Sequence, residues 1–171
     1  MKKNTLKTEV FVYSCPKHEN LCSKMKKYLM PLISNGKITV WDKTQIIAGT
    51  KILTEVTNAI NRAEIAILFV SSTFWADDVI CTEILPEICK KFENGSLIIG
   101  WVAVEKTMYD ETFLSEIMPI YDPNIPIRSQ KSKKQRETFL KIAQWVKQRV
   151  DNINSCKFKK KQARVLKVIK I

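Results

Sequence analysis

The sequence predicts an α/β fold in which a parallel, five-stranded β-sheet is covered by helices on both faces. Short apolar, β-branched runs alternate with segments of about 10–18 residues that have helical apolar spacing, a pattern typical of strands joined by crossover helices. Residues 65–71 form a continuous apolar run, as expected of a central strand buried on both faces. The 171 residues, 45% of them hydrophobic, are enough for one domain with a complete core.

The five expected strands are short and rich in branched and aromatic residues. They cover residues 9–13, 37–41, 65–71, 97–102 and 124–127. The last contains Pro126, which an edge strand tolerates because one side of its ladder is unpaired. Five strands with intervening helices favour a flavodoxin-like, three-layer arrangement with the strand order 2-1-3-4-5.

Four helices are expected between and after these strands. The first has apolar residues at helical spacing from Leu21 to Leu32 and ends at Asn35-Gly36. The second presents an apolar face from Leu53 to Ala63. The other two cover residues 74–92 and 133–150, and residues 42–50 and 103–132 are expected to be loops.

The domain is expected to span residues 8–151. Residues 152–171 do not continue the alternation and are expected to be a basic C-terminal tail or the start of a following domain. From Cys156 onward the chain is rich in Lys and then alternates apolar residues with others, which fits either a strand of a following domain or a disordered end.

The positive charge lies at one end of the chain. Residues 1–130 contain 15 Lys/Arg and 15 Asp/Glu, whereas residues 131–171 contain 14 Lys/Arg and only two acidic residues. Such a basic region is most simply a solvated helix face with a tail, but it can also bind nucleic acid or an acidic partner. No apolar run exceeds about eight residues, so we expect no membrane span. Lys2 and Lys3 are followed by polar residues and not by an apolar block, so we expect no cleavable signal peptide.

Several kinds of chemistry find little support in the sequence. The five cysteines are odd in number and lack CxxC spacing, which indicates reduced thiols in a cytoplasmic chain. A nucleophilic triad would have to use the one histidine, His18, and no acid in the sequence is placed to orient it. Metal-ligand clusters and the glycine-rich phosphate motifs of dinucleotide and P-loop sites are also missing from the sequence.

Glu83 is the carboxylate best placed for a role. It follows the third strand, and ligands of open α/β sheets bind beside the carboxyl ends of the strands. Pro86, three residues later, removes a helical hydrogen bond and clashes with the carbonyl of Thr82, so we expect a kink or a helix start beside Glu83. The alternative is that Glu83 is an ordinary surface acid of a helix, as Glu87 one turn later would be.

Four motifs, in order and with suitable spacing, resemble a TIR (Toll/interleukin-1 receptor/resistance) domain of the prokaryotic kind. The resemblance covers about residues 8–150. The motifs are Val10-Phe11-Val12 with Pro16-Lys17-His18-Glu19; Trp41-Asp42, Ile46 and Gly49 in the pattern W-D-x-x-x-I-x-x-G; Ala59-Ile60 and Ala63-Glu64-Ile65 with Leu68-Phe69-Val70-Ser71; and Phe74, Glu83, Leu85 and Pro86.

This resemblance implies an NAD⁺ nucleosidase that breaks the bond between nicotinamide and ribose, with NAD⁺ as substrate and no cofactor or metal. Glu83 would be the catalytic residue and stabilise an oxocarbenium-like transition state, as carboxylates do in glycoside hydrolysis. The substrate-binding residues implied are Tyr13 and Ser14 after the first strand, Trp41, Asp42, Ile46 and Gly49 in a mobile wall, Ser71 and Trp75 on the far side, and Val79 four residues before Glu83.

The resemblance also implies self-association through TIR–TIR contacts, activation by oligomerisation, a role in antiphage defence, and a sensor domain or partner protein. A second reading is a non-catalytic interaction and signalling module that recruits partners through the loop from Asp42 to Gly49. A third is a nucleoside-processing glycosyltransferase of similar form that also uses one glutamate. Whether the product is linear or cyclic ADP-ribose is open, because that depends on which nucleophile reaches the ribose.

Overall fold

Four parallel strands form the centre of the protein, in the order β2-β1-β3-β4. The computed structural model describes the backbone of residues 7–169 and the side chains of residues 7–160. The strands are β1 (Thr8–Ser14), β2 (Ile38–Trp41), β3 (Ile65–Val70) and β4 (Ile98–Ala103). Every residue of β3 is buried, which fits the central position expected from its continuous apolar sequence.

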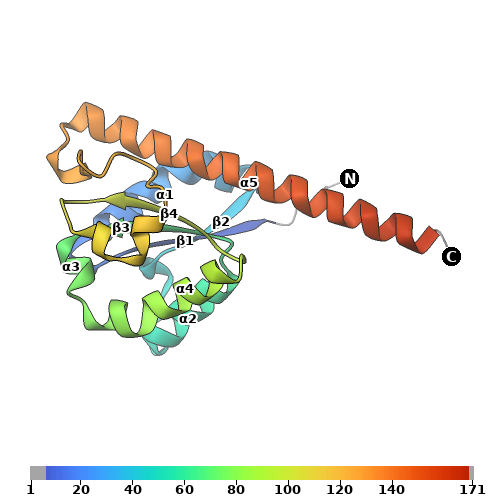
Figure 1. Cartoon of the computed structure of the whole chain (residues 1–171), viewed down its shortest axis with the longest axis horizontal. Coiled ribbons are helices and arrows are strands. Elements are labelled where there is room, and N and C mark those ends of the chain that lie inside the picture. Colours follow the sequence, from blue (N-terminus) through green and yellow to red (C-terminus); the bar gives the residue numbers. More distant parts are fainter. Residues whose placement is uncertain (1–6, 170–171) are drawn as a thin grey trace.

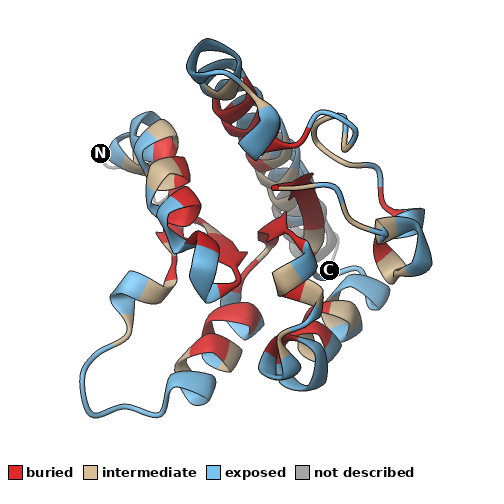
Figure 2. Ribbon diagram, turned by 90° about the vertical axis from the view of Figure 1, so that its left-hand side faces the viewer, coloured by how far each residue is buried: buried red, intermediate tan, exposed pale blue. Residues whose placement is uncertain are grey.

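Helices cover both faces of the sheet (Figure 1). One face carries α1 (Glu19–Ser34) and α5 (Ser132–Ile169), and the other carries α2 (Ile52–Arg62), α3 (Ser72–Trp75) and α4 (Leu85–Glu93). Successive residues of a strand point to opposite faces, so β1 contributes Phe11 and Tyr13 to one core and Val10 and Val12 to the other. Figure 2 shows the buried residues gathered on the strands and on the inner sides of the helices.

The prediction of a fifth strand over residues 124–127 is wrong. This segment is a turn that leads into the 3₁₀ helix η6 (Ile127–Ser129). Pro123 and Pro126 lack the N–H groups that a ladder needs, and the region meets β4 through two separated bonds. The Ile120 N–H donates to the Trp101 carbonyl (3.0 Å) and the Arg128 N–H to the Val104 carbonyl (3.0 Å). A loop therefore covers the β4 edge where the sequence suggested a strand.

The third predicted helix, over residues 74–92, is interrupted. After α3 the chain forms a π-helical turn, η3 (Ile80–Ile84), which continues into α4. Pro86 has no N–H to give to the carbonyl of Thr82, and the Leu85 N–H reaches back five residues to the Ile80 carbonyl. The kink or helix start expected beside Glu83 takes the form of a π-turn that leads into the start of α4, and π-turns are frequent at functional sites.

The last helix is much longer than predicted. α5 runs to Ile169, and its final part extends beyond the amino-terminal edge of the sheet (Figure 1). Residues 152–169 are therefore helical in the structure, in contrast to the strand or disordered end expected for them, and residues 170–171 lie outside the described part. α5 passes residue 152 without a break, so the domain boundary at this point stays a prediction. Among the described residues, no helix is both long and apolar enough to cross a membrane.

The connections contain short 3₁₀ helices. Two of them follow β1 and β2, at η1 (Pro16–His18) and η2 (Lys43–Gln45). Two more, η4 (Tyr109–Glu111) and η5 (Phe113–Glu116), lie in the long segment after β4. Since η1 and η2 both follow the carboxyl ends of strands, they place their side chains at the edge where ligands of open α/β sheets bind.

Candidate functional site

A cleft of about 560 Å³ opens at the carboxyl edge of the sheet, on the face covered by α2 and α4. This volume is within the range of small-molecule sites, roughly 300–1,000 Å³. We call it the acidic cleft. Its polar lining consists of Tyr13, Lys43, Asp77, Asp78, Thr82 and Glu83, and its apolar lining of Pro16, Ile52, Leu53, Val56, Val79 and Ile84.

Glu83 lies in the π-turn η3 and lines the acidic cleft. Its side chain is exposed, and none of the ion pairs found among the described residues involves it. A carboxylate without a cationic partner is available to a ligand that carries positive charge. The predicted residues Tyr13 and Val79 line the same cleft, so three of the ten predicted site residues are brought together.

The lining of the cleft has an excess of negative charge. Asp77, Asp78 and Glu83 are acidic, and Lys43 is the one cation among the lining residues. The Asp77 Oδ1 atom accepts a hydrogen bond from the Ile80 N–H (3.0 Å) and so fixes the start of the π-turn. Three negative charges around one cleft create a negative electrostatic potential that attracts cations. Across the described residues, no group of three or more His, Cys, Asp or Glu side chains is arranged to hold a metal ion.

Tyr13 is held at the cleft by a stack of aromatic rings. Its ring lies on that of Phe11 (centroids 5.3 Å apart), which lies on that of Trp41 (5.2 Å). Burial raises the pKa of the Tyr13 phenol well above its usual range, and the negative charges of Asp77 and Glu19 raise it further. The phenol therefore stays protonated at neutral pH and can donate a hydrogen bond to a ligand.

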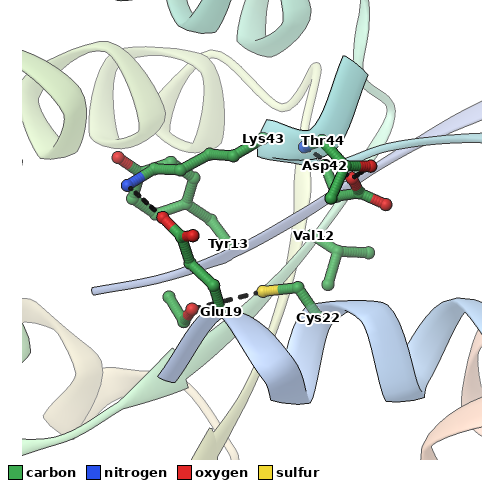
Figure 3. Close-up of a pocket in the computed structure, with 8 residues that line it drawn as sticks. Val12, Tyr13, Glu19, Cys22, Asp42, Lys43 and Thr44 are labelled. Carbon is green, nitrogen blue, oxygen red and sulfur yellow. Dashed lines mark hydrogen bonds and ion pairs between the residues drawn. The ribbon is translucent and has the colours of Figure 1, made fainter. Parts of the chain in front are cut away.

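Lys43 joins the acidic cleft to a second, much smaller cavity of about 20 Å³, shown in Figure 3. The Lys43 Nζ atom lies 3.4 Å from Glu19 Oε1 and 4.8 Å from the centre of the Tyr13 ring. Figure 3 shows the lysine side chain extending across Tyr13 toward Glu19. Because Lys43 and Tyr13 line both cavities, they form the junction between them.

Ser14 lines only the small cavity. Its hydroxyl donates to the Cys15 carbonyl (3.1 Å) and accepts from the Cys22 thiol (3.3 Å). Consecutive strand residues point to opposite faces, so Ser14 is turned away from the face that carries Tyr13. Burial raises the pKa of the Cys22 thiol to about 12, which keeps it a donor.

The predicted wall after β2 is anchored by three of its four residues. Asp42 is 1% exposed, accepts a hydrogen bond from the Thr44 N–H (2.9 Å) and pairs with Lys26 Nζ (3.2 Å). Trp41 and Ile46 pack against the core. Gly49 has a φ of +90°, a backbone conformation that favours glycine, so it is required for the turn. None of these four residues lines the acidic cleft.

The two residues expected on the far side are also structural. Ser71 is buried, and its hydroxyl caps α3 by accepting from the Phe74 N–H (3.1 Å). The Trp75 ring packs edge-on against Phe74 (centroids 5.3 Å apart) and Phe113 (6.4 Å). Neither residue lines the acidic cleft.

Sequence reasoning missed Lys43 and the pair Asp77-Asp78. Lys43 directly follows the Trp41-Asp42 motif, and the two aspartates come five and six residues before Glu83. The two aspartates ahead of Glu83 are the sequence feature that could have indicated an acidic cleft. The sequence alone does not distinguish them from the polar surface of an ordinary helix, because it does not show the π-turn.

Known proteins share only a distant likeness with this chain. No protein-family model matches the chain, and no curated protein matches it. Among solved structures, the chain is similar to the TIR domains in the structure of the activated Roq1 resistosome directly recognizing the pathogen effector XopQ. The two share 18% sequence identity with a TM-score of 0.46, over 80% of this chain and 84% of that chain. So distant a likeness identifies neither a family nor an activity, and the resemblance to TIR domains rests on the sequence motifs.

Proposed function

We propose that this protein is an NAD⁺ nucleosidase of the TIR type, with Glu83 as its catalytic carboxylate. The observation that supports the proposal most is that Glu83, Tyr13 and Val79 line one cleft of about 560 Å³ at the carboxyl edge of the sheet. Tyr13 lies near the end of β1, whereas Val79 and Glu83 lie four residues apart at the π-turn, so two segments distant in the sequence meet in this cleft. Such convergence of side chains in one cleft is what a ligand site requires.

The charge of the cleft suits the chemistry. The nicotinamide ring of NAD⁺ is a pyridinium, and it leaves as a neutral molecule when the bond to ribose breaks. Positive charge then develops on the ribose, and a carboxylate close to it stabilises that charge. Asp77 and Asp78 add negative potential to that of Glu83. The leaving group needs no proton, so a histidine is unnecessary for this step.

The other lining residues suit the remaining parts of NAD⁺. Lys43 is the cation to which the pyrophosphate would bind, since it is the one cation among the lining residues. The protonated Tyr13 hydroxyl can donate to a sugar hydroxyl or a phosphate oxygen. Val79 and Leu53 offer apolar surface to the nicotinamide ring.

Activation by oligomerisation, in an effector of antiphage defence, completes the proposal. It is supported by exposed apolar side chains that line the cleft, of which Ile52 is 63% exposed and Val79 53% exposed. Exposed apolar side chains gathered beside a site are typical of a surface that a partner covers. A neighbouring copy seated there would shield the cleft from water and strengthen the effect of Glu83.

The test is incubation with NAD⁺, with and without a crowding agent, followed by measurement of free nicotinamide. The Glu83→Gln variant is expected to lose release by at least about 100-fold, because the charge that stabilises the transition state is gone. Glu87→Gln is the matched control, since Glu87 lies four residues on and does not line the cleft. Turnover retained in Glu83→Gln would contradict the catalytic assignment.

The same exposed apolar residues favour a second candidate, a self-associating interaction module without catalysis. It predicts that the wild-type protein assembles but releases no nicotinamide at any concentration. A third arm of the assay, with free nucleosides as substrates, separates NAD⁺ cleavage from a nucleoside-processing activity.

A further inference from the structure

A second pocket, of about 280 Å³, lies at the carboxyl edge of the sheet on the face opposite the acidic cleft. We call it the basic pocket. It is formed where η1, α1, η6 and α5 meet, and its polar lining is Lys17, His18, Asn20, Lys24, Arg128 and Gln135. The 3₁₀ helix η1 separates the two sites, since Pro16 lines the cleft and the next two residues line the pocket.

The basic pocket holds three cations and no carboxylate among its lining residues. Lys24 has a neutral partner, since its Nζ donates to the Gln135 side chain and lies 4.9 Å from the centre of the Phe139 ring. Lys17 takes part in none of the ion pairs found within the described residues. Uncompensated cations around one concavity attract an anion.

One carboxylate, Glu105, lies just outside the pocket and is largely engaged elsewhere. Its Oε1 accepts hydrogen bonds from the Ser72 hydroxyl (2.6 Å) and the Ser72 N–H (3.2 Å). Its Oε2 is 3.9 Å from Arg128 Nη1, which is a long contact between half-exposed groups. Glu105 therefore compensates only part of the positive charge of Arg128 and Lys17.

His18 supplies an independent observation. Its side chain is 4% exposed, and its Nε2 atom is buried without a hydrogen-bond partner. Burial lowers the pKa of the imidazole, the nearby charge of Glu105 opposes this, and Arg128 and Lys17 lower the pKa further. A buried polar atom without a partner is costly, and a bound ligand that pairs with it would remove that cost.

We infer that the basic pocket binds the phosphate group of a small ligand through Lys17, Lys24 and Arg128. Three cations suit a dianion better than a singly charged carboxylate, and the guanidinium of Arg128 can bind two phosphate oxygens at once. The pocket is at the small end of ligand sites, so it fits a phosphate with a small organic group. This inference is independent of the activity proposed for the acidic cleft on the other face.

His18 reports on the pocket directly, because it is the one histidine in the chain. We would follow its imidazole proton signal by NMR in untagged protein while inorganic phosphate replaces chloride at constant ionic strength. The expected result is a saturable shift and a rise of the His18 pKa by about one unit, since a bound dianion stabilises the imidazolium. A linear, non-saturating response would overturn the proposal.

A pair of charge-matched variants shows whether the named residues hold the phosphate. Lys24→Gln with Arg128→Gln is expected to weaken binding about tenfold or more, since two charge-assisted contacts are lost. Lys27→Gln with Arg136→Gln removes the same net charge from exposed positions of the same helix, α1, and of α5, outside the pocket. Equal weakening in both variants would overturn the site and leave only general attraction to a basic protein.

The ligand class is tested with glycerol phosphate and acetate in the same titration. Glycerol phosphate is expected to bind at least as tightly as inorganic phosphate and acetate at least about tenfold more weakly. Acetate binding as tightly as phosphate would overturn the assignment of a dianion. Circular dichroism of each variant confirms that it is folded before its binding is compared.

Discussion

The ammonium group of Lys43 lies 4.8 Å from the centre of the Tyr13 ring, at the junction of the acidic cleft and the small cavity. The same ammonium is 3.4 Å from Glu19, so the lysine already has an anionic partner outside the acidic cleft. With NAD⁺ as the proposed substrate, an incoming pyrophosphate would compete with Glu19 for this one cation of the cleft lining. Under that proposal, Lys43 would determine substrate affinity more than the rate of the chemical step.

Replacing Lys43 by Gln is expected to raise the KM for NAD⁺ about three- to tenfold and to leave kcat nearly unchanged. The lost contact is made to the ground state and the transition state alike, so it affects binding uniformly. Steady-state kinetics with a nicotinamide readout measure both constants. Lys51→Gln is the control, because Lys51 is exposed and does not line the cleft. A fall in kcat with unchanged KM would contradict this role.

Pro86→Ala tests whether the π-turn positions Glu83. Alanine restores an N–H group at this position and removes the ring that clashes with the Thr82 carbonyl, so the turn can close to α-helix. An α-helical turn contains one residue fewer than a π-turn between hydrogen-bonded groups. Closing the turn would therefore rotate the preceding side chains by about 100° and carry Glu83 out of the cleft.

The expected result for Pro86→Ala is a large loss of nicotinamide release in a protein that still unfolds cooperatively in urea. Urea unfolding and the NAD⁺ assay are run on the same preparation. Glu87→Ala, which changes the neighbouring residue and leaves the proline, is expected to keep its activity. Full activity in Pro86→Ala would show that the π-turn does not determine the position of Glu83.

Much of the fold could be predicted from sequence because the buried strands have local signatures. The apolar run that became β3, and the periodicity of Leu21 to Leu29 in α1, each specify an element without knowledge of its neighbours. The fifth strand failed because apolar residues near Pro126 pack as a loop against β4, and two isolated hydrogen bonds replace a ladder. The contacts with β4 determine that this segment is a loop and not a strand, and the local sequence pattern does not contain that information.

The candidate site was only partly predictable for a similar reason. A motif marks residues that are needed, but it does not separate those that contact a ligand from those that support the fold. Asp42 and Ser71 cap short helices, and Trp41 supports the ring stack under Tyr13. Lys43, in contrast, reaches the cleft because η2 turns it over Tyr13, which depends on the geometry of that 3₁₀ helix.

Lys91→Ala is expected to destabilise the domain by about 1–2 kcal/mol. The Lys91 Nζ atom donates to the carbonyls of Ile60 (2.9 Å), Asn61 (2.9 Å) and Ala63, so it satisfies the last carbonyls of α2 with a positive charge. Such a contact combines hydrogen bonding with the helix dipole. For a domain of this size, thermal unfolding should shift by roughly 3–6 °C. Lys90→Ala is the control, since Lys90 is exposed beside it; an equal shift in both would contradict the capping role.

The stability of the protein is expected to fall as the pH drops below the ordinary histidine range, because of His18. Burial lowers its pKa in the folded state, so below about pH 6.5 the unfolded chain binds a proton that the folded protein does not. The folded state therefore loses stability from about pH 6.5 down to the lowered folded pKa, with a slope of at most about 1.4 kcal/mol per pH unit.

Urea unfolding at a series of pH values measures this slope, and His18→Asn should abolish it. Carboxylates such as Asp151, whose pKa is lowered by Lys147 and Lys37, act only at more acidic pH. A wild-type slope that persists in His18→Asn between pH 5.5 and 6.5, roughly the interval where histidine titrates, would assign it to another group.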